Sequence, residues 1–331
     1  MKKIIMFDIR EEERTLVARW AEEQGVQVEA RVESLTPDNV GRVQGYDGLS
    51  LQAAKPLAAE LYPQLEAYGI KQIAQRSVGF EQYDLDLAKK HGLIISNVPA
   101  YSPASIAEFA VTTALVLIRR LPALEAQMAA QDFRRLPAVR GRVLGEMTVG
   151  IVGTGRIGLA AARLFRGFGC QVLGYDQYPS EEAKGTLTYV ASLEDLVSQA
   201  DVISLHMPLT AENAGQFSTE MFKHFKAGSY LVNTARGQIV DTKALLAALD
   251  AGQLAGAALD TYEEEAKFVG QRFSGESLES GEFKTLLEHP KIYFTPHIAY
   301  YTDTAVKNIV EESLDAVLAV LETGDTELRV N

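Results

Sequence analysis

The chain has 331 residues, which is long enough for two domains with cores of their own. With 47% hydrophobic and 23% charged residues, it has the composition of an ordinary globular protein. Its formal net charge of −12 argues against nucleic acid and against an anionic membrane as partners, because both favour clusters of Lys and Arg.

Three features indicate a cytoplasmic protein. Cys170 is the single cysteine, so no intrachain disulfide is possible, which suits a reducing compartment. The apolar run at the N-terminus meets Asp8 at once and is too short for a signal peptide. The most apolar long segment, 106–121, carries Glu108 and Arg119 and is too short and too polar to span a bilayer. We expect it to be a buried or interface helix.

Short apolar strands alternate with amphipathic helices in the first part of the chain. The expected strands are 4–7, 26–30, 48–51, 71–75 and 93–96, and the expected helices are 11–24, 56–68 and 84–91. Strands separated by helix-length segments predict a parallel sheet with helices on both faces. Pro99 and Pro103 then resist helix, and we expect the crossing to a second domain there, followed by a long helix from Ser105.

The second half repeats this alternation, which predicts an α/β fold with two doubly wound domains. The expected strands are 149–152, 171–175, 202–206, 230–233, 256–260 and 292–294, and the expected helices are 218–224, 241–251 and 302–322. Segment 268–283 is rich in Gly, Ser and Glu, and we expect an exposed loop there.

A glycine turn follows the strand at 149–152. Gly153 would allow a sharp turn, Gly155 would leave no Cβ between the backbone and a pyrophosphate, and Gly158 would let the next helix lie close to the strand. The free N–H groups at the start of that helix suit an anion. The glycine pattern alone is a weak signal, but its position between strand and helix predicts a dinucleotide site.

Asp176 ends the next strand, 23 residues after Gly153. A carboxylate at this position accepts hydrogen bonds from a ribose diol and repels a 2′-phosphate, which favours NAD over NADP. The alternative is that Asp176 is an ordinary turn residue at the end of a strand.

Three residues could carry chemistry beside a bound nicotinamide. Arg236, Glu265 and His297 each follow an expected strand, and open α/β sheets bind ligands at that edge. Arg236 could hold a carboxylate by two parallel hydrogen bonds, and His297 could be a general acid that Glu265 keeps protonated. The alternative for Glu265 is a solvated turn, because it is the last of three consecutive glutamates.

Several motifs together resemble the D-isomer-specific 2-hydroxyacid dehydrogenases, and among them most closely the D-lactate dehydrogenase branch. The motifs are GTGRIG at 153–158, VNTARG at 232–237, LDTYEEE at 259–265 and FTPHIA at 294–299, with SVGF at 77–80 and NVPAYSP at 97–103. The resemblance covers the whole chain.

The resemblance implies an NAD-dependent enzyme that reduces a short 2-keto acid, with pyruvate the first expectation. It implies that Arg236 binds and polarises the substrate, that His297 is the acid/base and that Glu265 is its partner. It further implies that the backbone amides of Val78 and Gly79 bind the substrate carboxylate, with Tyr101 nearby.

The resemblance also implies the cofactor site and the domain arrangement. The expected cofactor-binding residues are Gly153, Gly155, Arg156, Ile157, Gly158, Asp176, Pro208, Thr234 and Asp260. Pro208 would line the adenine side, although a plain loop proline is the alternative, and Asp260 would lie near the nicotinamide amide. The expected domains are a Rossmann NAD-binding domain at 101–299 and a smaller flavodoxin-like substrate domain at 1–100 and 300–331, with the active site in the cleft between them.

Two segments depart from the family pattern and leave the substrate side chain open. Gln52-Ala53-Ala54 stands where lactate enzymes carry an aromatic residue, and 80–83 differs from the usual sequence after Gly79. Larger 2-keto acids such as phenylpyruvate or 2-ketoisocaproate are therefore alternatives. A formate dehydrogenase would need no proton donor, and a phosphoglycerate dehydrogenase would need cationic groups for its phosphate. A binding protein that senses NADH without turnover is the remaining alternative.

Two further expectations concern partners and metals. The apolar helix at 105–121 has more apolar surface than one sheet face needs, which predicts a homodimer, and the resemblance points to the same helix. The other histidines have no spacing typical of metal ligands, so we expect no metal site. They are His91, His206, His224 and His289.

Overall fold

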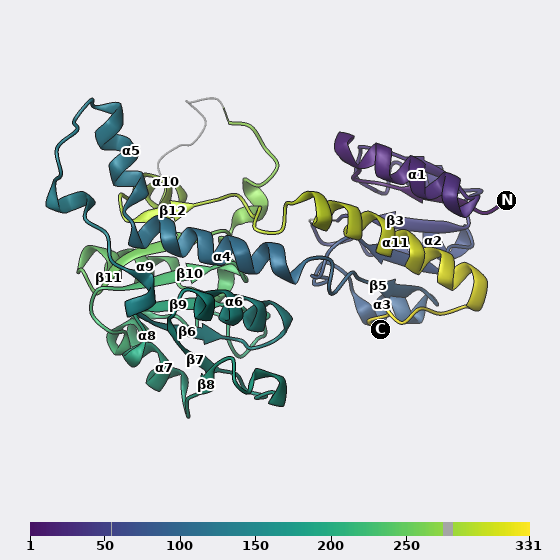
Figure 1. Ribbon diagram of the computed structural model, residues 1–331. Coiled ribbons are helices and arrows are strands. Elements are labelled where there is room, and N and C mark those ends of the chain that lie inside the picture. The colour runs from purple at the N-terminus through teal and green to yellow at the C-terminus, as the bar shows by residue number, and fades with distance from the viewer. Residues whose placement is uncertain (54, 274–280) are drawn as a thin grey trace. The chain divides into compact units, whose positions relative to one another are not determined.

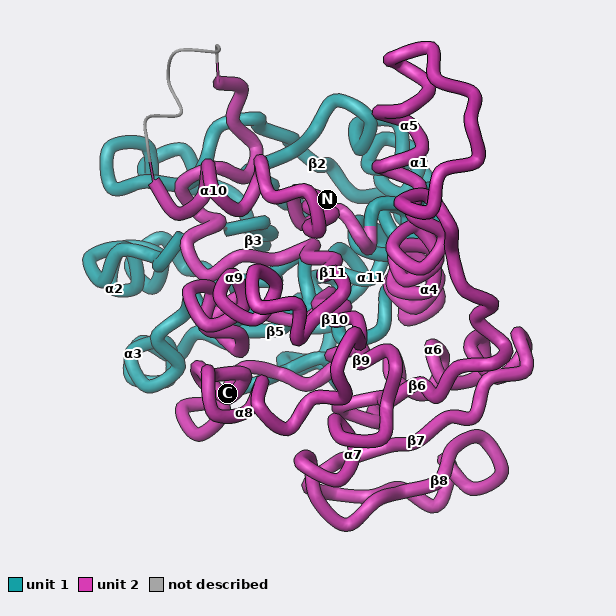
Figure 2. The backbone as a smooth tube through the Cα atoms, turned by 90° about the vertical axis from the view of Figure 1, so that its left-hand side faces the viewer, with its two compact units in different colours: residues 1–102, 301–331 teal, residues 103–300 magenta. Residues whose placement is uncertain are grey.

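The computed structural model describes residues 1–53, 55–273 and 281–331, and the chain divides into two units (Figures 1 and 2). Unit 1 comprises Met1–Ser102 and Tyr301–Asn331, and unit 2 comprises Pro103–Tyr300. The C-terminal part of the chain thus completes the unit that the N-terminal part begins. The fold of each unit follows from its own sheet.

Unit 1 contains a five-stranded parallel sheet in the order β2-β1-β3-β4-β5, which is the flavodoxin-like order. Its strands are β1 (Lys3–Met6), β2 (Gln27–Ala30), β3 (Gly48–Leu51), β4 (Gln72–Gln75) and β5 (Ile94–Ser96). Its helices are α1 (Arg14–Gln24), α2 (Leu61–Ala67), α3 (Leu85–Lys90) and α11 (Asp303–Thr323).

Successive residues of β1 face opposite sides of this sheet, and both sides are covered. Ile4 and Met6 pack in one core with residues of α1 and α11, whereas Ile5 packs in a second core with residues of α2. Because both faces are buried, β1 and β5 read as continuous apolar runs rather than as alternating ones.

Unit 2 contains a seven-stranded parallel sheet in the order β12-β11-β10-β9-β6-β7-β8. Its strands are β6 (Thr148–Val152), β7 (Gln171–Tyr175), β8 (Thr188–Tyr189), β9 (Val202–Leu205), β10 (Ser229–Asn233), β11 (Leu254–Leu259) and β12 (Ile292–Phe294). Counted from β6, this is the Rossmann order with one more strand at the edge. The order reverses at β6, between β7 and β9, where such sheets bind ligands.

Helices cover both faces of the sheet of unit 2. They are α4 (Pro103–Ile118), α6 (Arg156–Gly167), α7 (Leu193–Gln199), α8 (Thr219–His224), α9 (Thr242–Asp250) and α10 (Glu282–Glu288). A further helix, α5 (Leu121–Ala129), follows α4 and has no buried residue. Residues of α4 and α6 pack in one core with Val149 and Ile151, while α7, α8 and α9 pack in the other core with Val152. The predicted α/β class, with two doubly wound sheets, is confirmed.

Some elements differ from the sequence prediction. The helix expected at 105–121 is interrupted: α4 ends at Ile118, and Arg120 has a left-handed backbone with a φ of 55° before α5 begins. The short elements β8, α7 and α10 were not expected. In the loop expected at 268–283, α10 already begins at Glu282, and residues 274–280 lie outside the described residues.

Candidate active site

The expected site residues of unit 2 lie at one edge of its sheet. The glycine turn follows β6, Asp176 follows β7, Pro208 follows β9, Thr234 and Arg236 follow β10, Asp260 and Glu265 follow β11, and His297 follows β12. Because all seven strands are parallel, their carboxyl ends meet at this edge. Val78, Gly79 and Tyr101 belong to unit 1, where they follow β4 and β5.

The three glycines of the turn have three different steric surroundings. Gly153 has a φ of +87°, and a Cβ there would lie 2.6 Å from the amide nitrogen of Met207. A Cβ on Gly158 would lie 1.9 Å from the carbonyl oxygen of Gly153, so α6 lies against the end of the strand. A Cβ on Gly155 would meet nothing within 4 Å, which leaves open space above the turn. Only glycine fits at Gly153 and at Gly158.

The start of α6 fits the pyrophosphate of a dinucleotide. Its N-cap residue is Gly155, which has no side chain to cap the helix. The first-turn N–H groups of Arg156, Ile157 and Gly158 therefore point toward the open space with the positive end of the helix dipole behind them.

Asp176 is held against this turn by Thr154. Its Oδ2 accepts hydrogen bonds from the amide of Thr154 at 2.6 Å and from the Thr154 hydroxyl at 3.1 Å, and its Oδ1 accepts one from the amide of Tyr178 at 2.9 Å. A carboxylate has about four lone-pair positions, so Asp176 can still accept a hydrogen bond from a ribose hydroxyl.

His297 and Glu265 form a hydrogen-bonded ion pair, with 2.8 Å between Nδ1 of the histidine and Oε1 of the glutamate. The other carboxylate oxygen of Glu265 accepts a hydrogen bond from the amide of Tyr262 at 3.1 Å, which fixes the side chain. Burial acts to lower the pKa of His297, but the hydrogen bond and charge of Glu265, aided by the charge of Asp260, outweigh it and raise the pKa above its ordinary value. The imidazolium form is therefore more favoured than it is in a free histidine.

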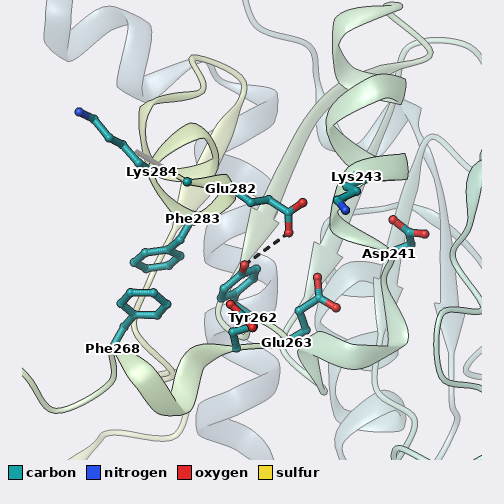
Figure 3. A pocket seen from close by; sticks show the side chains of 10 residues that line it. Asp241, Lys243, Tyr262, Glu263, Phe268, Glu282, Phe283 and Lys284 are labelled. Atoms are coloured by element: carbon teal, nitrogen blue, oxygen red, sulfur yellow. Dashed lines mark hydrogen bonds between the residues drawn. The ribbon is translucent and has the colours of Figure 1, made fainter. Parts of the chain in front are cut away.

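The other two glutamates of the run point elsewhere. Glu263 and Glu264 are exposed, and Glu264 pairs with Lys267 at 2.6 Å. Both line an open pocket of about 670 Å³ beside the stacked rings of Phe268 and Phe283 (Figure 3). Of the three glutamates, only Glu265 contacts His297. The alternative of a solvated turn therefore holds for Glu263 and Glu264 but not for Glu265.

Asp260 positions the segment that carries His297. This aspartate is 2% exposed, and its Oδ1 accepts hydrogen bonds from the Thr295 hydroxyl at 2.6 Å and the Ile298 amide at 3.0 Å, while its Oδ2 accepts one from the Ala299 amide at 2.8 Å. The backbone of His297 is left-handed, with a φ of 54°. Such a conformation is uncommon outside glycine and needs surrounding contacts of this kind to persist.

Arg236 lies in a loop that Asn233 shapes. The buried amide side chain of Asn233 accepts a hydrogen bond from the Ala235 amide at 3.0 Å and donates one to the Arg236 carbonyl at 3.0 Å. A Cβ on Gly237 would lie 2.1 Å from the carbonyl carbon of Tyr262, so this loop packs directly on the turn that leads to Glu265. The charge of Arg236 acts on His297 and lowers its pKa, against the stronger effect of Glu265.

Two expected cofactor residues and one unexpected neighbour complete this edge. The Thr234 hydroxyl is buried and has no hydrogen-bond partner within the described part of the chain, so it can bind an added ligand. Pro208 is exposed, and its carbonyl accepts a hydrogen bond from Asn213 at 2.7 Å. His206, beside the glycine turn, was not expected in the site; burial lowers its pKa to about 4, so it is neutral at pH 7.

In unit 1, three successive carbonyl groups are held by hydrogen bonds. The carbonyl of Ser77 accepts from the Val98 amide at 2.9 Å, that of Val78 from the Asn97 side chain at 2.6 Å, and that of Gly79 from the Ser77 hydroxyl at 2.7 Å. In a trans peptide the N–H points away from the C=O, so the amide of Val78 faces away from the Ser77 carbonyl and the amide of Gly79 faces away from the Val78 carbonyl. Neither donates a hydrogen bond to any residue in 1–53, 55–273 or 281–331.

The hydroxyl-bearing and amide-bearing residues that shape these loops carried no clear signal in the sequence. The partner of Asn97 is the Val78 carbonyl, which becomes adjacent only in the fold, whereas Asn233 bonds the backbone two and three residues further along. Tyr101, which was expected, is 7% exposed, and its carbonyl accepts a hydrogen bond from Asn308 of α11 at 2.7 Å.

Two kinds of feature are missing from residues 1–53, 55–273 and 281–331. No group of three or more His, Cys, Asp or Glu side chains there could hold a metal ion. No helix in the same ranges has the length and apolar character needed to cross a membrane.

Comparison with known proteins gives consistent results. Residues 111–299 match the family model of the D-isomer specific 2-hydroxyacid dehydrogenase NAD binding domain. A D-lactate dehydrogenase of Streptococcus agalactiae serotype V is 52% identical over 329 residues, which covers 99% of this chain and 100% of the relative.

Solved structures agree over the full length. A D-2-hydroxyisocaproate dehydrogenase matches with a TM-score of 0.92 and 40% identity, covering 99% of each chain. A D-lactate dehydrogenase with NAD⁺ from Lactobacillus jensenii matches with a TM-score of 0.90 and 36% identity, also covering 99% of each chain. The family resemblance and the NAD cofactor inferred from the motifs are thus confirmed. The chain belongs to the D-isomer specific 2-hydroxyacid dehydrogenases and is an NAD-dependent oxidoreductase.

Proposed function

We propose that the protein reduces pyruvate to D-lactate with NADH. The observation that carries this proposal is the His297–Glu265 pair at 2.8 Å, with Arg236 close enough for its charge to act on the histidine. The 52% identical relative is named D-lactate dehydrogenase, which supports pyruvate as the first substrate to test. A formate dehydrogenase would have no use for this proton donor.

In the proposed reaction, bound NADH supplies hydride to the carbonyl carbon of the keto acid. Arg236 forms two parallel hydrogen bonds with the substrate carboxylate and polarises the carbonyl group. His297 donates the proton that the carbonyl oxygen needs, and Glu265 keeps the imidazole charged and in one orientation until then. In the oxidative direction the neutral histidine accepts the same proton.

Binding of substrate and cofactor is assigned by the same proposal. The free amides of Val78 and Gly79 would bind the substrate carboxylate, with Tyr101 nearby. The NAD pyrophosphate would bind at Gly153, Gly155, Arg156, Ile157 and Gly158, the adenosine ribose at Asp176, the adenine side at Pro208, and the nicotinamide side at Thr234. Asp260 would act near the nicotinamide by positioning the His297 segment.

The size of the group attached to the keto carbon distinguishes pyruvate from the alternative substrates. One structural relative is a D-2-hydroxyisocaproate dehydrogenase, and Gln52 and residues 80–83 depart from the lactate pattern. The experiment is a panel of pyruvate, 2-ketoisocaproate and phenylpyruvate with NADH, followed by the loss of absorbance. We expect the highest kcat/KM for pyruvate. NADH binding without oxidation by any keto acid would instead support a sensor protein.

The protein is further proposed to be a cytoplasmic homodimer. The expected interface helix is largely buried within its own unit, since α4 contributes Ala110, Val111 and Ala114 to the core that it shares with α6. The exposed apolar residues lie on α5 instead, at Leu121, Leu124 and Met128. We name these three residues the α5 apolar stripe, and propose it as part of the dimer interface.

A further inference from the structure

Gln75 is a buried side chain that connects two segments of unit 1. It is the last residue of β4 and is 2% exposed. Its side chain reaches Ser77 in the loop with the free amides, Tyr83 beyond that loop, and both backbone atoms of Ala53 after β3. A buried amide with this many partners fixes the positions of all of them.

The partners of Gln75 determine which way each hydrogen bond runs. The Ala53 amide can only donate, at 3.3 Å, so the atom that it contacts is Oε1. The Ala53 carbonyl can only accept, at 3.4 Å, so the atom facing it is Nε2. The Tyr83 hydroxyl must then donate to Oε1, at 2.5 Å. Burial raises the pKa of Tyr83 well above its ordinary value, so this donor keeps its proton.

The hydrogen bonds of Nε2 lead into the loop that carries the free amides of Val78 and Gly79. Nε2 of Gln75 donates to the Ser77 hydroxyl at 2.9 Å, which leaves the single hydroxyl proton of Ser77 for the Gly79 carbonyl at 2.7 Å. The Gly79 carbonyl is thereby turned toward Ser77. The Asn97 side chain holds the Val78 carbonyl at 2.6 Å and the Val98 amide holds the Ser77 carbonyl at 2.9 Å, so the peptides that carry the Gly79 and Val78 amides are fixed as well.

We propose that Gln75 is a positioning residue for keto-acid binding. Through the Ser77 hydroxyl it holds the Gly79–Phe80 peptide, and so fixes the loop whose Val78 and Gly79 amides bind the carboxylate. Through Ala53 it ties that loop to the segment that begins at Gln52. This inference rests on the proposed function, because it takes the amides of Val78 and Gly79 as the carboxylate site. Gln75 itself touches no reacting atom.

The test replaces Gln75 by Met in the full-length enzyme, which keeps the length of the side chain and removes its hydrogen bonds. The matched control is Gln72→Met. Gln72 lies on the same strand, is also 2% exposed and donates to a serine hydroxyl, that of Ser96, at 2.7 Å. Each enzyme is assayed for KM and kcat with pyruvate, for inhibition by oxamate, and for NADH affinity by fluorescence.

We expect Gln75→Met to raise the pyruvate KM and the oxamate inhibition constant about tenfold, with NADH affinity unchanged. Gln72→Met should leave both near wild type. The ratio of kcat/KM for pyruvate over phenylpyruvate should also fall in Gln75→Met alone, because the loop is then released from Ala53. Equal effects of the two substitutions would overturn the proposal.

Ser77→Ala tests the route by which Gln75 acts. It should raise the pyruvate KM to a similar extent, and the double variant with Gln75→Met should be no worse than either single variant. If the double variant raised the pyruvate KM by the product of the two single effects, Gln75 and Ser77 would act by separate routes, which would contradict the proposal. If Gln75→Met does not fold, Tyr83→Phe removes only the donor to Gln75 and should show the same pattern at smaller size. Wild-type turnover of keto acids, measured alongside, tests the proposed function separately.

Discussion

Three adjacent glutamates of one turn differ in what they touch. Glu265 is half-buried and bonds His297, Glu264 pairs with Lys267 on the surface, and Glu263 is exposed. The difference arises because the amide of Tyr262 holds one carboxylate oxygen of Glu265, so the other oxygen points at the imidazole. A carboxylate in that position raises the pKa of the histidine, whereas Glu263 and Glu264 lie at the surface.

Glu265→Gln should move the pH dependence of keto-acid reduction. The reaction needs protonated His297, so kcat/KM falls as the pH rises through the pKa of that histidine, which Glu265 holds above its ordinary value. Removing the negative charge lowers this pKa, and the falling limb should shift to lower pH. The measurement is a pH profile of kcat/KM for pyruvate.

Glu263→Gln is the matched control for this prediction. It makes the same change of charge two residues away, on a side chain that does not contact His297. Its pH profile should overlay that of wild type. If the Glu265→Gln profile also overlaid it, Glu265 would be another solvated glutamate and the proton path would need a different partner.

The sequence motifs identified the candidate catalytic residues more readily than the residues that position them. Arg236, Glu265 and His297 could be named because each follows a strand and matches a family motif. The orienting contacts of Asp260, Asn233 and Gln75 could not, because their partners lie far along the chain or are backbone atoms. An amide or carboxylate whose partners lie far along the chain, as for Asp260 and Gln75, has no characteristic sequence spacing.

At the scale of elements, Gly158 decides how α6 meets β6. A Cβ at this position would lie 1.9 Å from the Gly153 carbonyl oxygen, so Gly158→Ala must push the helix away from the turn. We expect a clear loss of thermal stability and weaker NADH binding, measured by thermal unfolding and by fluorescence titration.

Gly167→Ala gives the comparison within the same helix. This glycine ends α6, and a Cβ there would meet nothing within 4 Å. Alanine is the better helix former by about 0.5–1 kcal/mol, so stability should stay the same or rise slightly. A Gly158→Ala protein as stable as Gly167→Ala would contradict the close packing of α6 on the turn.

Long, strongly patterned elements were predictable, and short or interrupted ones were not. The strands buried on both faces gave clear apolar runs, as in β6 and β9. The two-residue strand β8 is too short to show a pattern. The break between α4 and α5 falls at Arg120, whose left-handed backbone no glycine marks. Arg119, Arg120 and Pro122 are helix-stop signals, but they are weaker than a glycine and the apolar pattern runs across them.

For the molecule as a whole, the proposed dimer can be tested at the α5 apolar stripe. Helix α5 contributes no buried residue to its unit, and it stands away from the sheet of unit 2 (Figure 1). Leu121, Leu124 and Met128 lie on one face of it, at the spacing of an interface helix. Leu124→Lys should therefore convert a dimer to a monomer at micromolar concentration, as measured by light scattering.

Phe168→Lys is the control for a surface charge placed elsewhere on unit 2. Phe168 is 51% exposed and follows α6 rather than α5. The mass of this variant should equal that of wild type. A wild-type protein that scatters as a monomer would refute the dimer, and a Leu124→Lys dimer would move the interface away from the stripe.

The discontinuity of unit 1 has a consequence for the order in which the chain is completed on the ribosome. Val310, Leu314 and Val317 of α11 complete the core that Ile4 and Met6 share with α1, so one face of the first sheet lacks part of its cover until the C-terminal helix has been made. All of Pro103–Tyr300 is synthesised in between, and that unit holds both of its own cores. The inserted unit can therefore fold first during translation, and the unit that contains the N-terminus is finished last.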